Sequence, residues 1–304
     1  MTAMPKGMRY VDLHFQAVPA VIATAVLDGS DGVTLVDPGP GSCLDRLHAE
    51  LASLGMNARD VSTILLTHIH LDHAGATGSL VAENPRIRVF VHERGARHMI
   101  DPAKLLDSAR RLYGEAMDRL WGEFLPVPDG NVRVITGGEH IEVADRRLEV
   151  AYTPGHASHH VAYFDDDSGL AFVGDTAGVR IGTSTFIMAP TPPPDIDLGA
   201  WASSVERILA WKPETLFLTH FGPSPSPAIH LEELLARLRT NAAIARRALL
   251  GGGTDAEQAT RFQLDMREEL RRHMTDGEAV SYELAVPLDH CYLGLARYWR
   301  KAGA

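Results

Sequence analysis

Short apolar runs and helix-spaced leucines alternate along the first part of the chain. The aliphatic and β-branched runs 20–27 and 33–36 flank Asp28-Gly29-Ser30-Asp31-Gly32, whose glycines supply the positive φ angles of a hairpin turn. Leucines spaced three or four positions apart then predict a helix over about 43–54, with Ser42 as its N-cap. The same alternation continues with two strands and a short helix, expected at 61–66, 87–91 and 78–83.

The segment 95–125 is helical by composition and carries apolar residues at roughly helical spacing. Two interpretations stay open, because this apolar stripe either packs on the protein body or forms a lid over a pocket. The proline-rich segment 190–194 is expected to be a loop, since proline neither continues a helix nor donates in a sheet. Further strands are predicted at 132–135, 140–143, 148–152, 161–164, 171–173 and 215–218, and further helices at 198–210, 231–250 and 255–273.

Composition disfavours nucleic-acid-binding and membrane proteins. The 304 residues carry 29 Lys and Arg against 39 Asp and Glu, a formal charge of −10, which disfavours binding to nucleic acid. The longest apolar stretch, 17–27, is too short to cross a bilayer, so no membrane association is expected. Cys43 and Cys291 are the only cysteines and form no CxxC pair, which is typical of a reducing, cytoplasmic setting.

Candidate chemistry is concentrated where predicted strands end. His68, His70, Asp72 and His73 fall within six residues directly after the strand 61–66. Imidazole and carboxylate are the ligands that borderline divalent ions prefer, and four of them in so short a loop can serve two adjacent ions. His156, Asp175 and His220 follow later strands and adjoin glycine, proline or threonine, so a shared site at one sheet edge is predicted.

With these residues in place, the sequence closely resembles the metallo-β-lactamase-fold superfamily of hydrolases, with matching landmarks from Asp37 to His220. The resemblance implies an α+β fold, the αββα sandwich of two mixed β-sheets flanked by helices. It also implies a main domain over 1–226, with a helical insertion at about 95–125, and a mainly helical C-terminal extension over 227–304. Carried over by position, His68, His70 and His156 would hold one metal, Asp72, His73 and His220 a second, and Asp175 would bridge both.

Several positions bear on the branch of the superfamily. Asp175 argues against a true β-lactamase, which lacks this carboxylate, and favours the glyoxalase-II-like and lactonase-like branches. His70 stands where the flavodiiron branch has Glu, which argues against a redox role with two iron ions. The residues after Asp175, Thr176-Ala177-Gly178, lack the tyrosine that lactonases of this family often place near the bridging Asp. This absence disfavours a lactonase. A persulfide dioxygenase with one iron shares the same ligands and remains an alternative, as does a phosphodiesterase or RNase of the same superfamily.

Residues around the expected ligands have two interpretations each. Asp37, in Asp37-Pro38-Gly39, is either part of a plain turn or a carboxylate that orients a ligand imidazole from behind. His160 is expected behind the ligands or in a structural role. His159 stands where glyoxalase-II-like sequences commonly have Gly, so its side chain either lies on the surface or protrudes toward the pocket. The arginines of the tail are expected on solvated faces of amphipathic helices.

The sequence thus predicts a dinuclear hydrolase for a small-molecule substrate. Two divalent ions, zinc first and iron or manganese as alternatives, lower the pKa of a shared water so that a bridging hydroxide attacks the carbonyl of a thioester, ester or lactone. Asp72 and Asp175 are the residues assigned to catalysis as well as to the metals. The substrate-binding residues are left unassigned, and a homodimer is compatible with the sequence.

Overall fold

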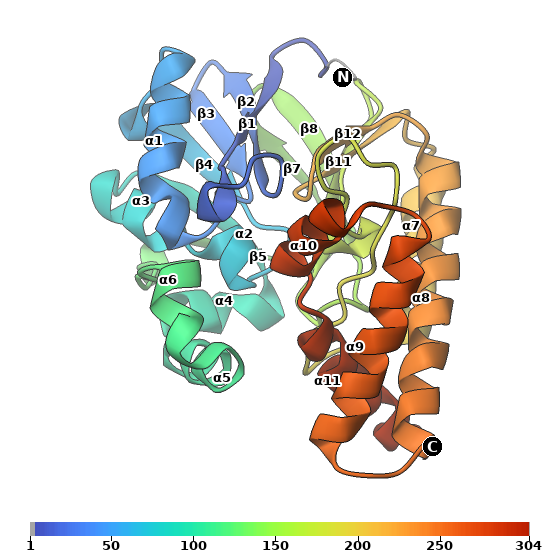
Figure 1. Ribbon diagram of the computed structural model, residues 1–304. Helices are drawn as coiled ribbons and strands as arrows, with labels where there is room; N and C mark the ends of the chain where they lie inside the picture. Colours follow the sequence, from blue (N-terminus) through green and yellow to red (C-terminus); the bar gives the residue numbers. More distant parts are fainter. Residues whose placement is uncertain (1–3, 304) are drawn as a thin grey trace.

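The computed structural model describes residues 4–303, and two six-stranded β-sheets lie at its centre (Figure 1). The first sheet runs in the order β1 to β6, antiparallel as far as β3 and parallel from β3 to β6. The second runs from β12 to β7, with β10 and β11 as its parallel pair. The strands are β1 (Met8–Asp12), β2 (Ala23–Gly29), β3 (Gly32–Val36), β4 (Val61–Leu65), β5 (Arg88–His92), β6 (Val132–Ile135), β7 (His140–Val143), β8 (Arg146–Tyr152), β9 (Val161–Asp165), β10 (Leu170–Phe172), β11 (Thr215–Leu218) and β12 (Gly222–Ser224).

Both faces of each sheet are covered. Leu27 of β2 packs between the sheets in a cluster that includes Tyr163 of β9, whereas its neighbour Val26 belongs to the cluster that contains Leu47 of α1. Successive side chains of a strand point to opposite faces, so a strand buried on both faces needs a layer on each side. The result is the four-layer αββα sandwich that the resemblance implied.

Helices lie on both outer sides of the sandwich (Figure 1). α1 to α6 alternate with the strands of the first sheet along the chain, and α7 lies against the second sheet. α8 packs on α7, α9 and α11 pack on α8, and α10 packs on α9. The helices are α1 (Leu44–Ser53), α2 (Leu71–Ala74), α3 (Thr77–Glu83), α4 (Glu93–Ile100), α5 (Ala103–Tyr113), α6 (Met117–Trp121), α7 (Leu198–Ala210), α8 (Pro227–Leu250), α9 (Asp255–Arg271), α10 (Asp276–Ala285) and α11 (Leu288–Lys301). None of the described helices is both long and apolar enough to span a bilayer.

Most of the expected elements are confirmed, and the exceptions have local causes. The hairpin forms with Gly29 opposite Gly32. Ser42 is not the N-cap of α1, because a short 3₁₀ turn precedes the helix and the Ser42 hydroxyl donates to the carbonyl oxygen of Leu120 at 2.6 Å. The edge strands β1 and β12 were not predicted. The sequence of β12, Gly-Pro-Ser, has little strand propensity and is extended because it pairs with β11.

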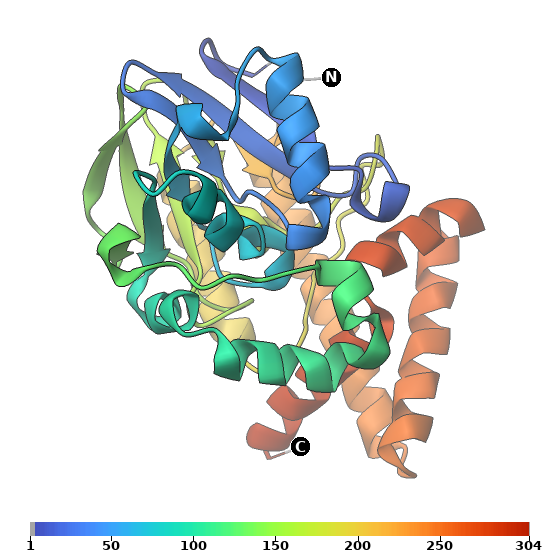
Figure 2. The same cartoon turned by 90° about the vertical axis from the view of Figure 1, so that its left-hand side faces the viewer.

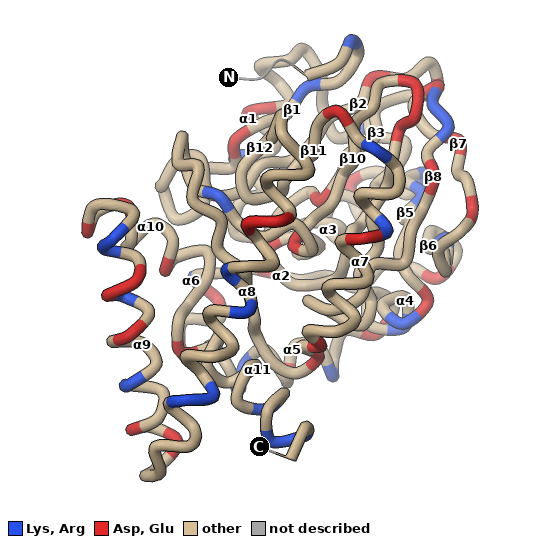
Figure 3. Tube along the Cα trace, turned by 90° about the vertical axis from the view of Figure 1, so that its right-hand side faces the viewer, with Lys and Arg blue, Asp and Glu red and all other residues tan. Residues whose placement is uncertain are grey.

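The C-terminal helices α8 to α11 are joined by short turns and pack through apolar faces that belong to the main core cluster. Charges of both signs lie along α8 and α9 (Figure 3), whereas the charged residues of α10 are all acidic. Arg237 lies 3.3 Å from Glu269, and Arg267 lies 2.7 Å from Glu283, so arginines of the tail are engaged between helices. The separation of 1–226 from 227–304 into two domains stays a prediction.

Helices α4, α5 and α6 form the insertion expected at 95–125, and α5 and α6 extend toward the C-terminal helices (Figure 2). The chain that returns from α6 passes directly over the main domain. A Cβ added to Gly78 of α3 would lie 2.0 Å from the carbonyl oxygen of Leu125, and one added to Gly41 would lie 2.1 Å from that of Glu123. Because these two glycines have no Cβ, the backbone at the base of the insertion can pack directly against the sandwich.

We expect Gly78→Ala to destabilise the protein by about 1–3 kcal/mol, because the added methyl group forces the backbone at Leu125 away from α3. Gly130→Ala is the matched control, since Gly130 has open space around the position of a Cβ. Urea unfolding measures both free energies. Equal unfolding free energies for the two variants would show that the insertion is not held at this contact.

Candidate metal centre

The seven expected metal ligands lie at one edge of the sandwich, where strands of both sheets end. His68 and His70 are in the loop after β4, and α2 supplies Asp72 and His73. From the second sheet come His156 after β8, Asp175 in the 3₁₀ turn (Gly174–Ala177) after β10, and His220 between β11 and β12. The two sheets therefore contribute to the same cluster.

Three imidazoles form the first group. The Nδ1 atom of His70 lies 3.0 Å from Nε2 of His68 and 2.9 Å from Nε2 of His156. These nitrogen atoms all lie within 4.8 Å of one another, close enough to share one cation. Three nitrogen ligands at this spacing suit a borderline divalent ion.

Two imidazoles and a carboxylate form the second group. Oδ2 of Asp72 lies 3.2 Å from Nε2 of His220 and 3.6 Å from Nε2 of His73. Asp175 lies between the two groups, because its Oδ1 is 3.3 Å from Nε2 of His73 and its Oδ2 is 3.4 Å from Nε2 of His156. One carboxylate thus faces both groups with different oxygens.

The far nitrogen of each anchored imidazole is fixed by a hydrogen bond. Nδ1 of His156 lies 2.9 Å from the carbonyl oxygen of Pro190, and Nδ1 of His220 lies 2.8 Å from that of Val21. A carbonyl oxygen can only accept, so each Nδ1 carries a proton and each Nε2 is the nitrogen that faces the cluster. Such hydrogen bonds set both the tautomer and the orientation of a ligating histidine.

Asp37 does the same for His73 and is fully buried. Its Oδ2 lies 2.8 Å from Nδ1 of His73 and accepts the hydroxyl protons of Thr67 at 2.7 Å and Thr219 at 2.8 Å. Its Oδ1 accepts from the backbone N–H of Thr67 at 2.8 Å. Asp37 is therefore more than a turn residue, since four donors converge on its carboxylate.

His160 lies behind the cluster. Its ring stacks on that of His68 at 5.0 Å, and its Nδ1 is 2.9 Å from the hydroxyl of Thr153. Gly174 lies directly against Nε2 of this ring, where a Cβ would approach to 2.6 Å, and it adopts a φ of +45°. Glycine is required at this position both by the contact and by the backbone conformation.

The protonation states of the groups favour a cation at the centre. Burial, together with the charge on His73, lowers the pKa of His68 well below the usual value for histidine, and burial lowers the pKa of His70 to about 4. Burial opposes ionisation of Asp72, but His73 and His220 outweigh it and lower the pKa of Asp72 to about 2. At neutral pH His68 and His70 are therefore neutral and Asp72 is ionised, the forms that bind metal ions. Burial opposes protonation of His73 and His220, but the facing carboxylates of Asp72 and Asp175 outweigh it and raise the pKa of both imidazoles, so a bound cation would take the place of these protons.

Two buried atoms provide a direct test of whether a metal fits. Nε2 of His73 and Oδ1 of Asp175 are inaccessible to solvent and make no hydrogen bond within the described residues, although they face each other as an ion pair at 3.3 Å. Both atoms face the cluster. Buried polar atoms are nearly always paired, so their orientation into a set of metal-type ligands fits a bound cation.

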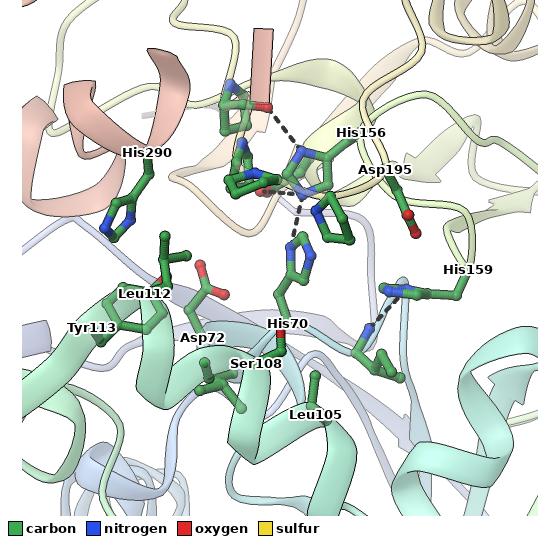
Figure 4. A pocket seen from close by; sticks show the side chains of 18 of the residues that line it. His70, Asp72, Leu105, Ser108, Leu112, Tyr113, His156, His159, Asp195 and His290 are labelled. Atoms are coloured by element: carbon green, nitrogen blue, oxygen red, sulfur yellow. Dashed lines mark hydrogen bonds and ion pairs between the residues drawn. The ribbon is translucent and has the colours of Figure 1, made fainter. Parts of the chain in front are cut away.

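A cavity of about 630 Å³ opens above the cluster, and Figure 4 shows the side chains that line it. His70, Asp72, His156 and Asp175 form its floor. Helix α5 and the proline-rich loop, confirmed as a loop, supply two walls, and the α10–α11 junction supplies a third. The insertion therefore packs on the body and also covers the site, so both expectations for 95–125 describe part of its role.

Several cavity residues were not assigned from the sequence. Tyr113 of α5 and His290 of α11 meet across the cavity with ring centroids 4.9 Å apart. Burial, with a contribution from the charge of Asp72, raises the pKa of Tyr113 well above its usual value. Their contact depends on how the insertion packs against the tail, which no local pattern encodes. His159, expected either at the surface or toward the pocket, lines the cavity beside His70.

Comparison with known proteins supports the same family over most of the chain. The model of the metallo-beta-lactamase superfamily matches residues 18–220. The metallo-beta-lactamase fold-containing protein ST1585 of Sulfurisphaera tokodaii is 27% identical over 238 residues, which are 76% of this chain and 85% of that protein. The crystal structure of the metallo-beta-lactamase family protein TTHA1429 from Thermus thermophilus has a TM-score of 0.69 and 26% identity, and the match covers 99% of this chain and 96% of that one.

Relatives named for a reaction match only part of the chain. A hydroxyacylglutathione hydrolase of Synechococcus sp. is 32% identical over 142 residues, which are 47% of this chain and 42% of that protein. The chain thus spans less than half the length of this relative. The match to residues 18–220 contains all seven clustered residues, and the structure has the two-sheet sandwich of the family. The chain therefore belongs to the metallo-beta-lactamase superfamily.

Proposed function

We propose that the protein is a hydrolase that uses two divalent metal ions, zinc first, to cleave a thioester, ester or lactone at its carbonyl group. The observation that carries this proposal is the position of Asp175, whose two oxygens face the two ligand groups. In this proposal His68, His70 and His156 would hold one ion, Asp72, His73 and His220 would hold the second, and Asp175 would contribute to both. Bound at this spacing, such ions supply an acidified water and a Lewis acid for the carbonyl oxygen.

The remaining chemistry comes from the protein. Asp37 holds His73 in the orientation that keeps Nε2 directed at the cluster. The side chains around the cavity position the substrate above Asp72 and Asp175 and limit access of bulk water. Covalent catalysis is not favoured. Burial raises the pKa of the Cys291 thiol to about 11, and the Ser158 hydroxyl donates to Asp195 at 2.5 Å without an imidazole as base.

The first prediction from this proposal concerns the metals. Elemental analysis of the purified protein is expected to give two divalent ions per chain, and a chelator is expected to abolish hydrolysis of thioesters reversibly. Chelation should also lower the unfolding midpoint, because ions that bind only the folded state stabilise it by about 2.7 kcal/mol at a hundredfold excess over Kd. A panel of thioesters, lactones and phosphodiesters identifies the reaction. One iron per chain with oxygen uptake on a persulfide, or hydrolysis of phosphodiesters alone, would contradict the proposal.

The second prediction concerns the ligands. Asp72→Ala and His220→Ala are expected to abolish turnover and to reduce the metal content, because each removes a ligand of the second group. The control is His140→Ala, which removes an exposed imidazole on β7. Circular dichroism should show the same fold in all three variants. Full activity of either ligand variant at native metal content would exclude the second ion from the mechanism.

The third prediction concerns Asp37. Asp37→Asn is expected to weaken binding of the second ion by about 10–100-fold, because an amide cannot accept all the hydrogen bonds that orient His73 and Thr67. Competition with a chromogenic chelator measures this affinity, and Asp31→Asn, at an exposed residue, is the matched carboxylate-to-amide control. Unchanged affinity would mean that Asp37 acts only as a structural support.

A further inference from the structure

The cavity above the metal-ligand cluster has two chemically different ends, and α5 runs from one to the other. Lys104, Leu105, Ser108, Ala109, Leu112 and Tyr113 line the cavity, which places one face of α5 along its whole wall. At 1.5 Å per residue, Lys104 and Tyr113 are about 13 Å apart along the helix axis. The floor residues His70 and Asp72 lie between these ends (Figure 4).

The end near Tyr113 is apolar and enclosed. Leu112, Leu120 and Trp121 cover it from the insertion, and residues 284–287 cover it from the α10–α11 junction. Trp121 is 8% exposed, and its ring packs edge-on against Tyr113 at 5.0 Å. The ring of His290 also contacts that of Tyr113 at this end, with centroids 4.9 Å apart. A group bound here meets mainly apolar side chains and is limited in size.

The end near Lys104 is cationic and open to solvent. Arg94, Arg97 and Lys104 are exposed residues on the cavity wall. Arg94 lies over the ring of Tyr152 and Arg97 donates to His98, so within the described residues neither guanidinium is paired with a carboxylate.

Glu93 and Asp195 share this end, and Asp195 already accepts a hydrogen bond from Ser158. The three cations outnumber these two carboxylates in a chain whose formal charge is −10. The open end therefore has a local charge opposite to that of the whole chain and suits an anionic group.

We propose that the substrate is a thioester of an apolar acyl group with an anionic thiol carrier. The acyl group occupies the enclosed end, the carrier lies against Arg94, Arg97 and Lys104, and the carbonyl carbon lies above the cluster between them. This inference rests on the proposed hydrolase function. It assigns a substrate class to the cavity and a specificity role to the insertion and the C-terminal helices.

The orientation follows from the shape of the two ends. A carrier that bears several charges is large and well hydrated, so it belongs at the open end, whereas the enclosed end has room only for a small apolar group. A lactone does not separate into two parts on hydrolysis, so a site with two distinct ends suits it less well. In the reaction the C–S bond breaks, the oxygen of water forms a C–O bond to the acyl carbon, and the products are a carboxylic acid and a thiol. A thiol has a pKa near 8.5, so the thiolate departs without a strong acid beside it.

A substrate series tests both ends at once. With the metal-loaded protein and one carrier, coenzyme A, kcat/KM is expected to rise about three- to fourfold per methylene from acetyl to hexanoyl until the enclosed end is filled. The hexanoyl thioester of uncharged pantetheine is expected to react about tenfold more slowly at low salt, because it lacks the anionic groups. S-hexanoyl glutathione distinguishes a carboxylate carrier from a phosphate carrier. Either of the two charged carriers reacting faster than the pantetheine thioester supports the proposal.

Paired variants locate the two ends. Ala285→Trp extends a side chain into the enclosed end and is expected to abolish the preference for hexanoyl over acetyl, whereas Val280→Trp, at a residue of the same helix that is 69% exposed, leaves it intact. Arg97→Glu with Lys104→Glu should remove the advantage of a charged carrier. Arg110→Glu with Arg111→Glu makes the same charge change outside the cavity and should preserve that advantage.

A binding experiment tests the assignment of the two cavity ends independently of hydrolysis. S-hexyl coenzyme A is a thioether with no carbonyl group, so calorimetry reports its binding without turnover, and a negative heat-capacity change is expected on burial of the hexyl chain. If acetyl pantetheine reacts as fast as hexanoyl coenzyme A and the cavity variants change nothing, the hydrolase stands and the substrate class is wrong. If the thioether binds as predicted but no thioester, ester or lactone is cleaved, the proposed function is wrong and the assignment of the two ends stands.

Discussion

The structure depends on one buried carboxylate that connects both halves of the sandwich. Asp37 follows β3, accepts hydrogen bonds from Thr67 after β4 and from Thr219 after β11, and lies against His73 of α2. A fully buried carboxylate is costly unless several donors satisfy it, so these segments must stay in register with one another. The same contacts that satisfy Asp37 direct His73 into the cluster, which links the stability of the fold to the geometry of the site.

The site follows from where the strands of the sandwich end. Parallel and antiparallel strands from both sheets terminate at one edge, and each termination supplies a short loop that carries one or more ligand-type side chains. Backbone carbonyls behind His156 and His220 fix the ring orientations, so the cluster is built on the rigid part of the fold. The insertion and the C-terminal helices contribute no residue to it and instead enclose the space above it.

Sequence patterns could predict the cluster because its information is local. The spacing of His68, His70, Asp72 and His73 after an apolar run indicates both the ligand chemistry and the position at a strand end. The cavity could not be predicted in this way. Tyr113 and His290 are separated by most of the chain, and their contact depends on how α5 packs against α11. Ser42 shows that a local signal can also mislead. Its side chain suits an N-cap, but its hydroxyl donates to the carbonyl oxygen of Leu120 in the insertion instead.

We propose that seven side chains from both sheets hold two cations on either side of Asp175. Anomalous diffraction from crystals of the metal-loaded protein tests it most directly, because it locates metal ions independently of activity. Under this proposal two peaks are expected, about 3.5–4 Å apart, with one carboxylate oxygen of Asp175 directed at each. A single peak away from Asp175, or no peak after loading with zinc, iron and manganese, would contradict it.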